Sequence, residues 1–207
     1  MSDEEVLDQS GRPLGPRALQ TRRRLLEATE KLLDSQKLRD LRVIDIAREV
    51  GTSAATFYQY FRDVDDVVLK LAEQTADEMP VMLQQLEGSW EGEDGQRKAR
   101  AIVESFIEHW DRHRTVLHVR NLASDEGDEK FLALRARTML PVLRVLARVI
   151  EEQRGDVPGH PHAMAAGLAA ILELLAAYHE PLEAFGVTRE HLIQSSADIL
   201  HRTVTGR

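Results

Sequence analysis

Residues 43–61, VIDIAREVGTSAATFYQYF, carry the pattern that most restricts how this chain can fold. Four apolar residues in the first half recur at helical spacing and end at Gly51, a residue type preferred just after a helix. The second half continues as another short helical segment, for which Thr52 or Ser53 is the expected N-cap. The sequence therefore predicts two short helices joined by a tight turn.

The rest of the chain repeats the helical pattern, and we find no strand pattern in it. Asp63 is expected to cap a long fourth helix that Pro80 stops or kinks near Met79, and Thr115 is expected to cap a short helix. A kink is also expected at Pro141. We expect an all-α fold of about nine helices, over residues 17–33, 43–50, 52–61, 64–79, 96–112, 116–123, 128–154, 162–179 and 188–204.

Composition places the chain among soluble globular proteins, with 43% hydrophobic and 30% charged residues. No apolar run approaches the roughly 18 residues needed to cross a bilayer, so we expect no membrane association. The acidic N-terminus lacks the basic start and apolar core of an export signal, and the chain has no cysteine. These features together predict a cytoplasmic protein.

Charge is unevenly distributed along the chain. The net charge is −8, yet residues 11–62 hold eleven basic and six acidic residues, a local net charge of +5. A basic segment on an acidic chain is expected where one part meets a polyanion. A solvated charged surface is the alternative explanation.

The segment 52–61 divides into two faces at helical spacing. Phe57 and Phe61, four residues apart, are expected to pack inward. Tyr58 and Gln59 then face outward with two alanines, where hydroxyls can bond phosphates, the amide can bond adenine, and methyl groups can contact thymine. This face favours DNA binding; a core helix with tyrosines at its rim is the alternative.

These residues resemble the helix-turn-helix of TetR-type bacterial transcriptional repressors. The matching positions are Asp45-Ile46-Ala47, Gly51-Thr52-Ser53 and Thr56-Phe57-Tyr58-Gln59-Tyr60-Phe61. The resemblance implies a homodimer on double-stranded DNA with a near-palindromic operator. We expect a flexible lead-in at residues 1–16, a DNA-binding domain at 17–63, and a ligand-binding and dimerisation domain at 64–207.

Two departures from the family pattern affect the phosphate contacts. Arg42 stands where the family usually has serine or threonine, which loses a cap but offers a cation to a phosphate. The lysine that usually follows the last aromatic residue is missing, and Arg62 or Lys70 is expected to replace it. The predicted DNA-binding residues, most of them implied by the resemblance, are Arg42, Thr52, Ser53, Ala54, Ala55, Thr56, Tyr58, Gln59, Tyr60, Arg62 and Lys70.

Residues 162–179 are apolar almost all round and rich in alanine, which predicts a helix buried on every side. Burying it together with the last helix is easier if two copies of the chain pair, so we expect a C2 homodimer through these two helices.

The other helices of this domain are expected to enclose a small, lipophilic effector. The candidates are aromatic, apolar and polar side chains at helical spacing, any of which can instead be plain core: Phe106, His109, Trp110, His113, Leu117, Asn121, Met139, Leu143 and Glu173. Glu173 can alternatively form an ion pair at the dimer interface.

We expect no metal, cofactor or catalytic site. His109 and His113 are four residues apart, but Asp111 points to another face and no cysteine is present. The chain has no Gly-rich phosphate loop, nucleophile elbow or HExxH motif, so we expect that the protein is not an enzyme. The predicted function is a ligand-responsive repressor; the alternatives are an all-α enzyme or ligand carrier, and an activator or co-repressor-dependent regulator.

Overall fold

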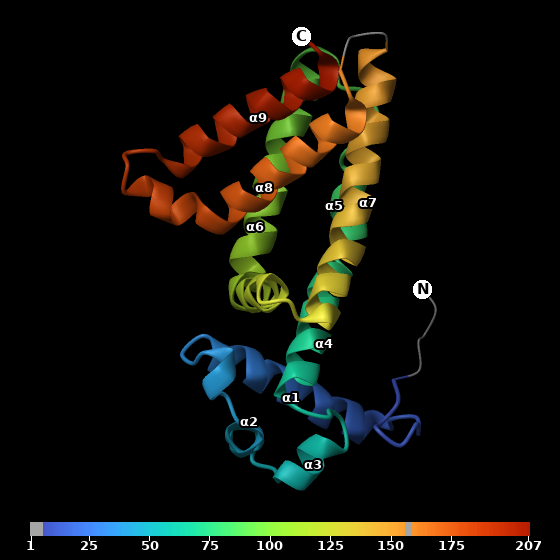
Figure 1. Ribbon diagram of the computed structural model, residues 1–207, viewed down its shortest axis with the longest axis vertical. Coiled ribbons are helices and arrows are strands. Elements are labelled where there is room, and N and C mark those ends of the chain that lie inside the picture. The colour runs from blue at the N-terminus through green and yellow to red at the C-terminus, as the bar shows by residue number, and fades with distance from the viewer. Residues whose placement is uncertain (1–5, 156–158) are drawn as a thin grey trace. The chain divides into compact units, whose positions relative to one another are not determined.

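A computed structural model describes residues 6–155 and 159–207 of the chain. These residues form nine α-helices and one short 3-10 helix, which confirms the predicted all-α fold (Figure 1). They divide into two compact units. The first unit holds the residues up to Thr75 together with Thr115–Leu132, and the second holds Ala76–Arg114 together with Ala133–Arg207.

The first unit begins with three helices that pack in sequence, α1 on α2 and α2 on α3. Pro16 opens α1 in the position where its missing N–H costs nothing. The side chains of Leu25, Ile46, Phe57 and Phe61 are fully buried and form the centre of this packing. The bounds are α1 Pro16–Leu33, η1 Leu38–Asp40, α2 Val43–Val50 and α3 Ala54–Tyr58.

Helix α4 (Val64–Ala76) follows, and the Asp63 carboxylate accepts the Asp66 backbone N–H at 2.8 Å, as its predicted capping role requires. The predicted effect of Pro80 is wrong in detail. Helix α4 already ends at Ala76, and Pro80 lies in the first turn of a new helix, α5 (Met79–Gln84). Proline is tolerated there because the first N–H groups of a helix have no intrahelical acceptor.

Helix α6 (Gly92–Asp125) consists of two helical parts that meet at a kink, which confirms the break that the sequence predicts between residues 112 and 116. The kink lies at His113, whose dihedral angles, φ −116° and ψ 19°, are not helical. Because His113 rather than Thr115 has the non-helical dihedral angles, Thr115 is not the cap of the second part. Its hydroxyl instead donates a hydrogen bond to Asp34, the C-cap residue of α1, so the second half of α6 is tied to α1 within the first unit.

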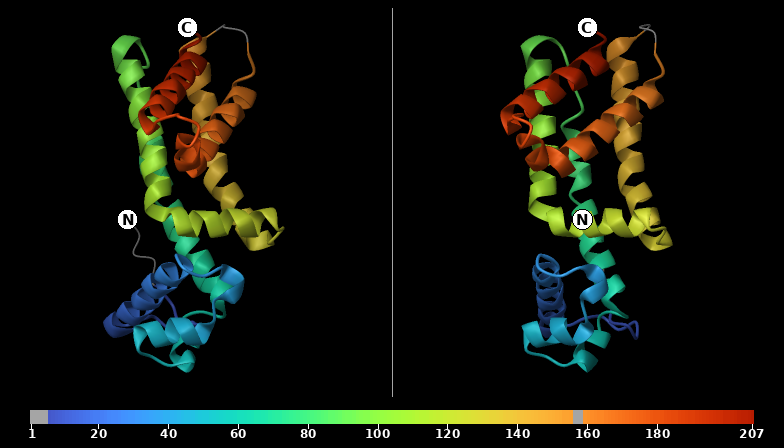
Figure 2. Two further views of the ribbon diagram at one scale, coloured as in Figure 1. Left: turned by 90° about the vertical axis from the view of Figure 1, so that its left-hand side faces the viewer. Right: turned by 60° about the vertical axis from the view of Figure 1, so that its left-hand side comes forward.

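The second unit contains most of α7 (Glu129–Arg154), together with α8 (Pro161–Glu183) and α9 (Arg189–Thr205). Helix α7 is continuous through Pro141. Helices α8 and α9 lie side by side in both views of Figure 2 and pack on each other. Thr188 caps α9 by accepting the His191 N–H at 3.2 Å.

Helix α8 is not buried on every side within one chain. Leu168 and Leu172 are buried on one face, while Ile171, Leu174 and Tyr178 are 40%, 63% and 54% exposed on another. By length and composition alone, α8 could cross a bilayer, contrary to the expectation that no segment would pass that test. Core helices of soluble proteins pass the same test, so this finding is weak evidence for a membrane.

Candidate nucleic-acid interface

The turn between α2 and α3 depends on a left-handed glycine. Gly51 has φ 72° and ψ 38°, a conformation that residues with a Cβ adopt only at a cost. The Gly51 N–H bonds Arg48 O at 3.0 Å, and the Thr52 N–H bonds Ala47 O at 2.9 Å. These two bonds satisfy the last carbonyls of α2 and set the direction in which α3 leaves the turn.

Ser53 is the N-cap of α3. Its hydroxyl oxygen accepts the Thr56 N–H at 3.2 Å and lies 3.1 Å from the Thr56 hydroxyl. Both hydroxyl groups are thus engaged in holding the helix start. The α-helix covers only Ala54–Tyr58 of the predicted segment, because the chain then tightens into a turn in which the Tyr60 N–H bonds Phe57 O at 2.9 Å.

The two predicted faces of this segment are present. Phe57 and Phe61 are fully buried, with ring centroids 5.4 Å apart, which confirms that they pack inward. Tyr58 is 52% exposed, and its ring meets the Phe57 ring edge-on at 5.7 Å. Ser53, Ala55 and Gln59 are also exposed, whereas the remaining predicted contact residues of the segment are only half exposed: Thr52, Ala54, Thr56 and Tyr60.

The three cations predicted to contact phosphates differ in their surroundings. Arg62 pairs with the buried carboxylate of Asp66 at 3.4 Å, and Lys70 pairs with Glu73 at 2.8 Å. Arg42, at the N-cap of α2, is exposed and makes no ion pair with any residue in the described part of the chain. Arg42 is therefore the cation best able to bind an external anion.

Part of the basic character of the first unit serves its own structure. Arg24 donates to Val50 O at 2.6 Å, and the guanidinium of Arg22 lies 5.3 Å from the Phe61 ring centroid. Burial lowers the pKa of Arg22, although the nearby carboxylates of Asp66 and Glu73 oppose that shift. Arg24 thus holds the end of α2, and Arg22 packs on the segment after α3.

Residues 6–15 are hydrogen-bonded in the structure, which differs from the flexible lead-in expected from the sequence; residues 1–5 lie outside the described residues. The Asp8 carboxylate accepts the Ser10 and Arg12 N–H groups at 2.8 and 2.9 Å. Gln9 then donates from its backbone to Gln59 O at 3.0 Å and from its side chain to Tyr60 O at 3.1 Å. The carbonyls just after a helix have no donor within the helix, so the Gln9 bonds supply donors to these two.

The predicted effector residues are divided between the two units. Leu117 and Asn121 belong to the first unit, and the other seven belong to the second. Trp110 is 6% exposed, and among the described residues its indole N–H has no acceptor. Glu173 pairs with Arg135 of α7 at 3.2 Å, so its partner lies within the same chain. Of the other predicted effector residues in the second unit, His109 is buried, and four are half-buried: Phe106, His113, Met139 and Leu143.

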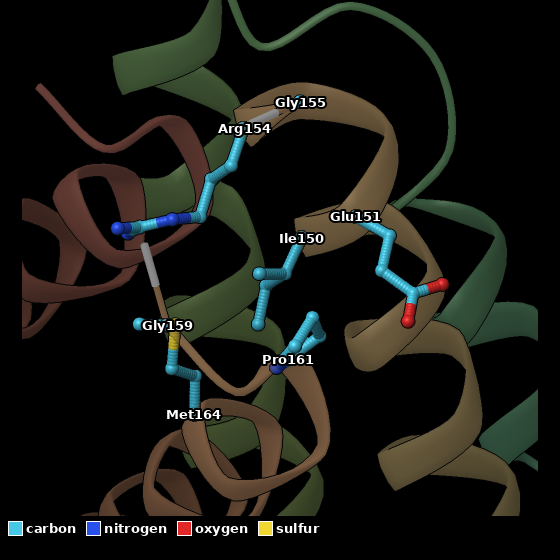
Figure 3. A pocket seen from close by; sticks show the side chains of 7 residues that line it. All are labelled: Ile150, Glu151, Arg154, Gly155, Gly159, Pro161 and Met164. Atoms are coloured by element: carbon cyan, nitrogen blue, oxygen red, sulfur yellow. The ribbon is translucent and has the colours of Figure 1, made fainter. Parts of the chain in front are cut away.

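A small pocket in the second unit lies where α7 ends and α8 begins (Figure 3). Its volume is about 110 Å³, well below the roughly 300–1,000 Å³ of most ligand sites. None of the predicted effector residues lines it; the lining residues are Ile150, Glu151, Arg154, Gly155, Gly159, Pro161 and Met164.

The fold also brings together a cluster that sequence reasoning missed. Glu78 lies 3.3 Å from His109 Nδ1, 2.8 Å from His113 Nε2 and 3.0 Å from Arg112 Nη1. Burial lowers the pKa of His109, and the neighbouring His113 adds to this shift. Partial burial would raise the pKa of Glu78, but the two histidines outweigh it and hold that pKa below its ordinary value.

Asp111, the acid nearest to these histidines in sequence, belongs to another network. It pairs with Arg189 at 2.8 Å and with Arg114 at 3.0 Å. The histidine pair at spacing four was visible in the sequence, whereas only the fold identifies Glu78 as its carboxylate partner.

The tight turn, the buried phenylalanines and the exposed face of α3 define a helix-turn-helix transcriptional regulator. Comparison with known proteins specifies which kind. Residues 83–207 match the family described as "Tetracyclin repressor-like, C-terminal domain", and residues 25–71 match "Bacterial regulatory proteins, tetR family". The chain belongs to the TetR family of DNA-binding transcriptional regulators, as the resemblance implied.

Individual relatives agree with this assignment. The chain is 27% identical over 160 residues to the HTH-type transcriptional regulator EthR of Mycobacterium tuberculosis H37Rv, covering 74% of each chain. It is 25% identical over 207 residues to an uncharacterized HTH-type transcriptional regulator of Haemophilus influenzae, covering 93% of this chain and 99% of that one. A putative transcriptional regulator of Pseudomonas aeruginosa PAO1 shares the fold, with a TM-score of 0.71, 18% identity and 93% coverage of both chains.

Proposed function

We propose that the protein is a cytoplasmic, homodimeric repressor that binds a near-palindromic operator and leaves it when a small lipophilic effector binds. Its function is regulatory rather than catalytic. The observation that carries the proposal is the exposed surface of α3, where Tyr58 and Gln59 project beside the exposed Ala55.

The chemistry of this surface suits a DNA groove. A tyrosine hydroxyl can bond a phosphate, and a glutamine amide can bond adenine at two atoms. Thr52, Ala54, Thr56 and Tyr60 border the same surface. Ser53 and Thr56 pre-form the helix start through their hydroxyl contact, so binding would not have to order it. Arg42, at the start of α2, supplies the phosphate contact that Arg62 and Lys70 can make only by sharing or leaving their carboxylates.

The dimer is proposed to form through α8 and α9. Ile171, Leu174 and Tyr178 are spaced three and four residues apart, so they line one exposed face of α8. Ile199 of α9 is likewise 44% exposed. An apolar surface of this kind is self-complementary in a C2 pair, which would bury it and place two copies of α3 about one DNA turn apart.

The effector is proposed to bind beside Trp110 in the second unit. Its buried indole N–H, without an acceptor in the described part of the chain, costs roughly 1–3 kcal/mol in the free protein. An effector with an apolar body and one acceptor atom would remove this cost while contacting Phe106, Met139 and Leu143. The resulting movement of the first half of α6 would reach its second half through His113, and then α1 through the Thr115–Asp34 bond.

Two substitutions test the DNA-binding face. Tyr58→Phe removes one hydroxyl and Gln59→Ala removes one amide, and each is expected to weaken specific operator binding by about 1 kcal/mol or more, roughly fivefold to tenfold. Gel-shift titration measures this change. Gln74→Ala, at an exposed position of α4, is the matched control and should bind as tightly as the wild type. Unchanged affinity in both test variants, with folding intact, would contradict the proposal that this face of α3 binds the operator.

A further inference from the structure

We propose that Glu78, His109 and His113 form a binding site for Zn²⁺, with one coordination position left for water. Two imidazole nitrogens and a carboxylate are a ligand set that zinc accepts in open, three-residue sites. The three ligand groups belong to one compact unit, so the site does not depend on the arrangement of the two units. Metal binding to the free protein is also independent of the proposed operator binding.

The distances between the ligand groups are close to those that zinc requires. In a tetrahedral site, ligand atoms about 2.0–2.1 Å from the metal lie roughly 3.3 Å from one another. His109 Nδ1 is 3.3 Å from one Glu78 oxygen, and His113 Nε2 is 2.8 Å from the other. All three residues offer ligand atoms within 4.8 Å of one another. Small side-chain rotations would therefore bring the three groups onto one ion.

The supporting structure already points both rings at the carboxylate. His109 and His113 are one turn apart on α6, with ring centroids 5.0 Å apart. His109 is buried, which removes much of the rotational freedom that an exposed histidine would lose on binding.

Among the described residues, Arg112 is the one cation that pairs with Glu78, and its position is compatible with a metal. Its Nη1 donates to Glu78 Oε2, while the side chain is 60% exposed. A carboxylate oxygen has two lone pairs, so Glu78 can bind the ion and still accept from Arg112, as outer-shell donors to metal-bound carboxylates commonly do. The exposed guanidinium can also turn away into solvent.

The site lies at two breaks in helical structure. Glu78 is in the short interval between α4 and α5, and His113 is the residue of α6 with non-helical dihedral angles. Zinc would fix Glu78 to α6 at its kink. A metal here would therefore stiffen the part of α6 through which the proposed effector signal passes.

Cobalt titration of the untagged, EDTA-treated full chain tests the site, because Co²⁺ in a zinc site absorbs visible light. We expect one Co²⁺ to bind per chain and to be displaced by Zn²⁺ but not by Mg²⁺. Glu78→Gln, which is nearly isosteric, and His113→Ala should each weaken binding by at least about tenfold.

The second histidine pair of the chain is the matched control. His160 and His162 have ring centroids 6.0 Å apart at the start of α8, and the double variant His160→Ala/His162→Ala should bind cobalt like the wild type. Circular dichroism melting of each variant confirms folding. No bound metal in the wild type, or wild-type affinity in either Glu78→Gln or His113→Ala, would overturn the proposal.

Discussion

Helices α3 and α8 each expose aromatic and apolar side chains, but in opposite chemical surroundings. On α3, the exposed Tyr58 lies beside Gln59, and the same unit exposes the cation Arg42. On α8, Leu174 and Tyr178 project from a face with Ile171 and small residues and without charge. The first surface can exchange water for a polyanion, whereas the second gains only from burial against another apolar surface.

This difference separates the two proposed interfaces by the forces that stabilise them. DNA binding through α3 should depend on salt and on single polar atoms. Pairing through α8 should depend on apolar area and tolerate salt, while a buried charge should break it. The three substitutions below test this distinction, beginning with the one expected to have the largest effect.

Phe57→Ala should separate the two faces of α3 most clearly. It removes a fully buried ring from the core of the first unit and should lower the free energy of unfolding by about 3–5 kcal/mol. Tyr58→Ala, the adjacent exposed ring, should lower it by only about 0.5 kcal/mol while weakening operator binding. Urea denaturation measures the free energy of unfolding of both variants. Equal losses of stability would contradict the division into an inward and an outward face.

Leu174→Asp should disrupt the α8 surface. An unpaired carboxylate buried in an apolar interface costs about 3–5 kcal/mol, so the dimer should dissociate at concentrations about 100-fold higher or more. Sedimentation equilibrium measures the change. Leu140→Asp, at a 46% exposed leucine of α7, is the control and should leave the association unchanged. Persistence of a wild-type dimer in Leu174→Asp would place the interface elsewhere.

Arg42→Ala should have the smallest effect and is best seen in the salt dependence of binding. Loss of one phosphate contact per chain reduces the slope of log K against log salt by about 0.9 for each contact. Lys70→Ala should change the slope less, because Lys70 is paired with Glu73. If Lys70→Ala had the larger effect, it would be the substitute for the missing family lysine.

The helix-turn-helix could be predicted from sequence because its determinants are local. Gly51 ends α2, and the spacing of Phe57 and Phe61 assigns the inner face of the segment without reference to distant residues. The long helices were also visible from their apolar periodicity. Pro80 was misjudged because a proline fits both a helix stop and a helix start, and sequence pattern does not separate the two.

The features that escaped prediction depend on pairs of residues far apart in the chain. Glu78 meets His109 and His113 across 31 and 35 residues, and Thr115 reaches Asp34 across 81. Helical spacing predicts neither contact, since it relates only residues a turn or two apart. The bonds of Gln9 to the end of α3 likewise cross about 50 residues, in a segment whose composition suggested a flexible chain.

The central claim is that α3 reads a specific operator as part of a dimer, and selection of bound fragments from genomic DNA by the purified protein tests it most directly. The account predicts enrichment of an inverted repeat whose half-site centres are about 10–10.5 base pairs, or a multiple of this distance, apart. It also predicts that Gln59→Ala loses this enrichment while keeping weak, salt-sensitive binding. Fragments without a shared sequence, or the same repeat selected equally well by Gln59→Ala, would contradict the assignment of sequence recognition to this face.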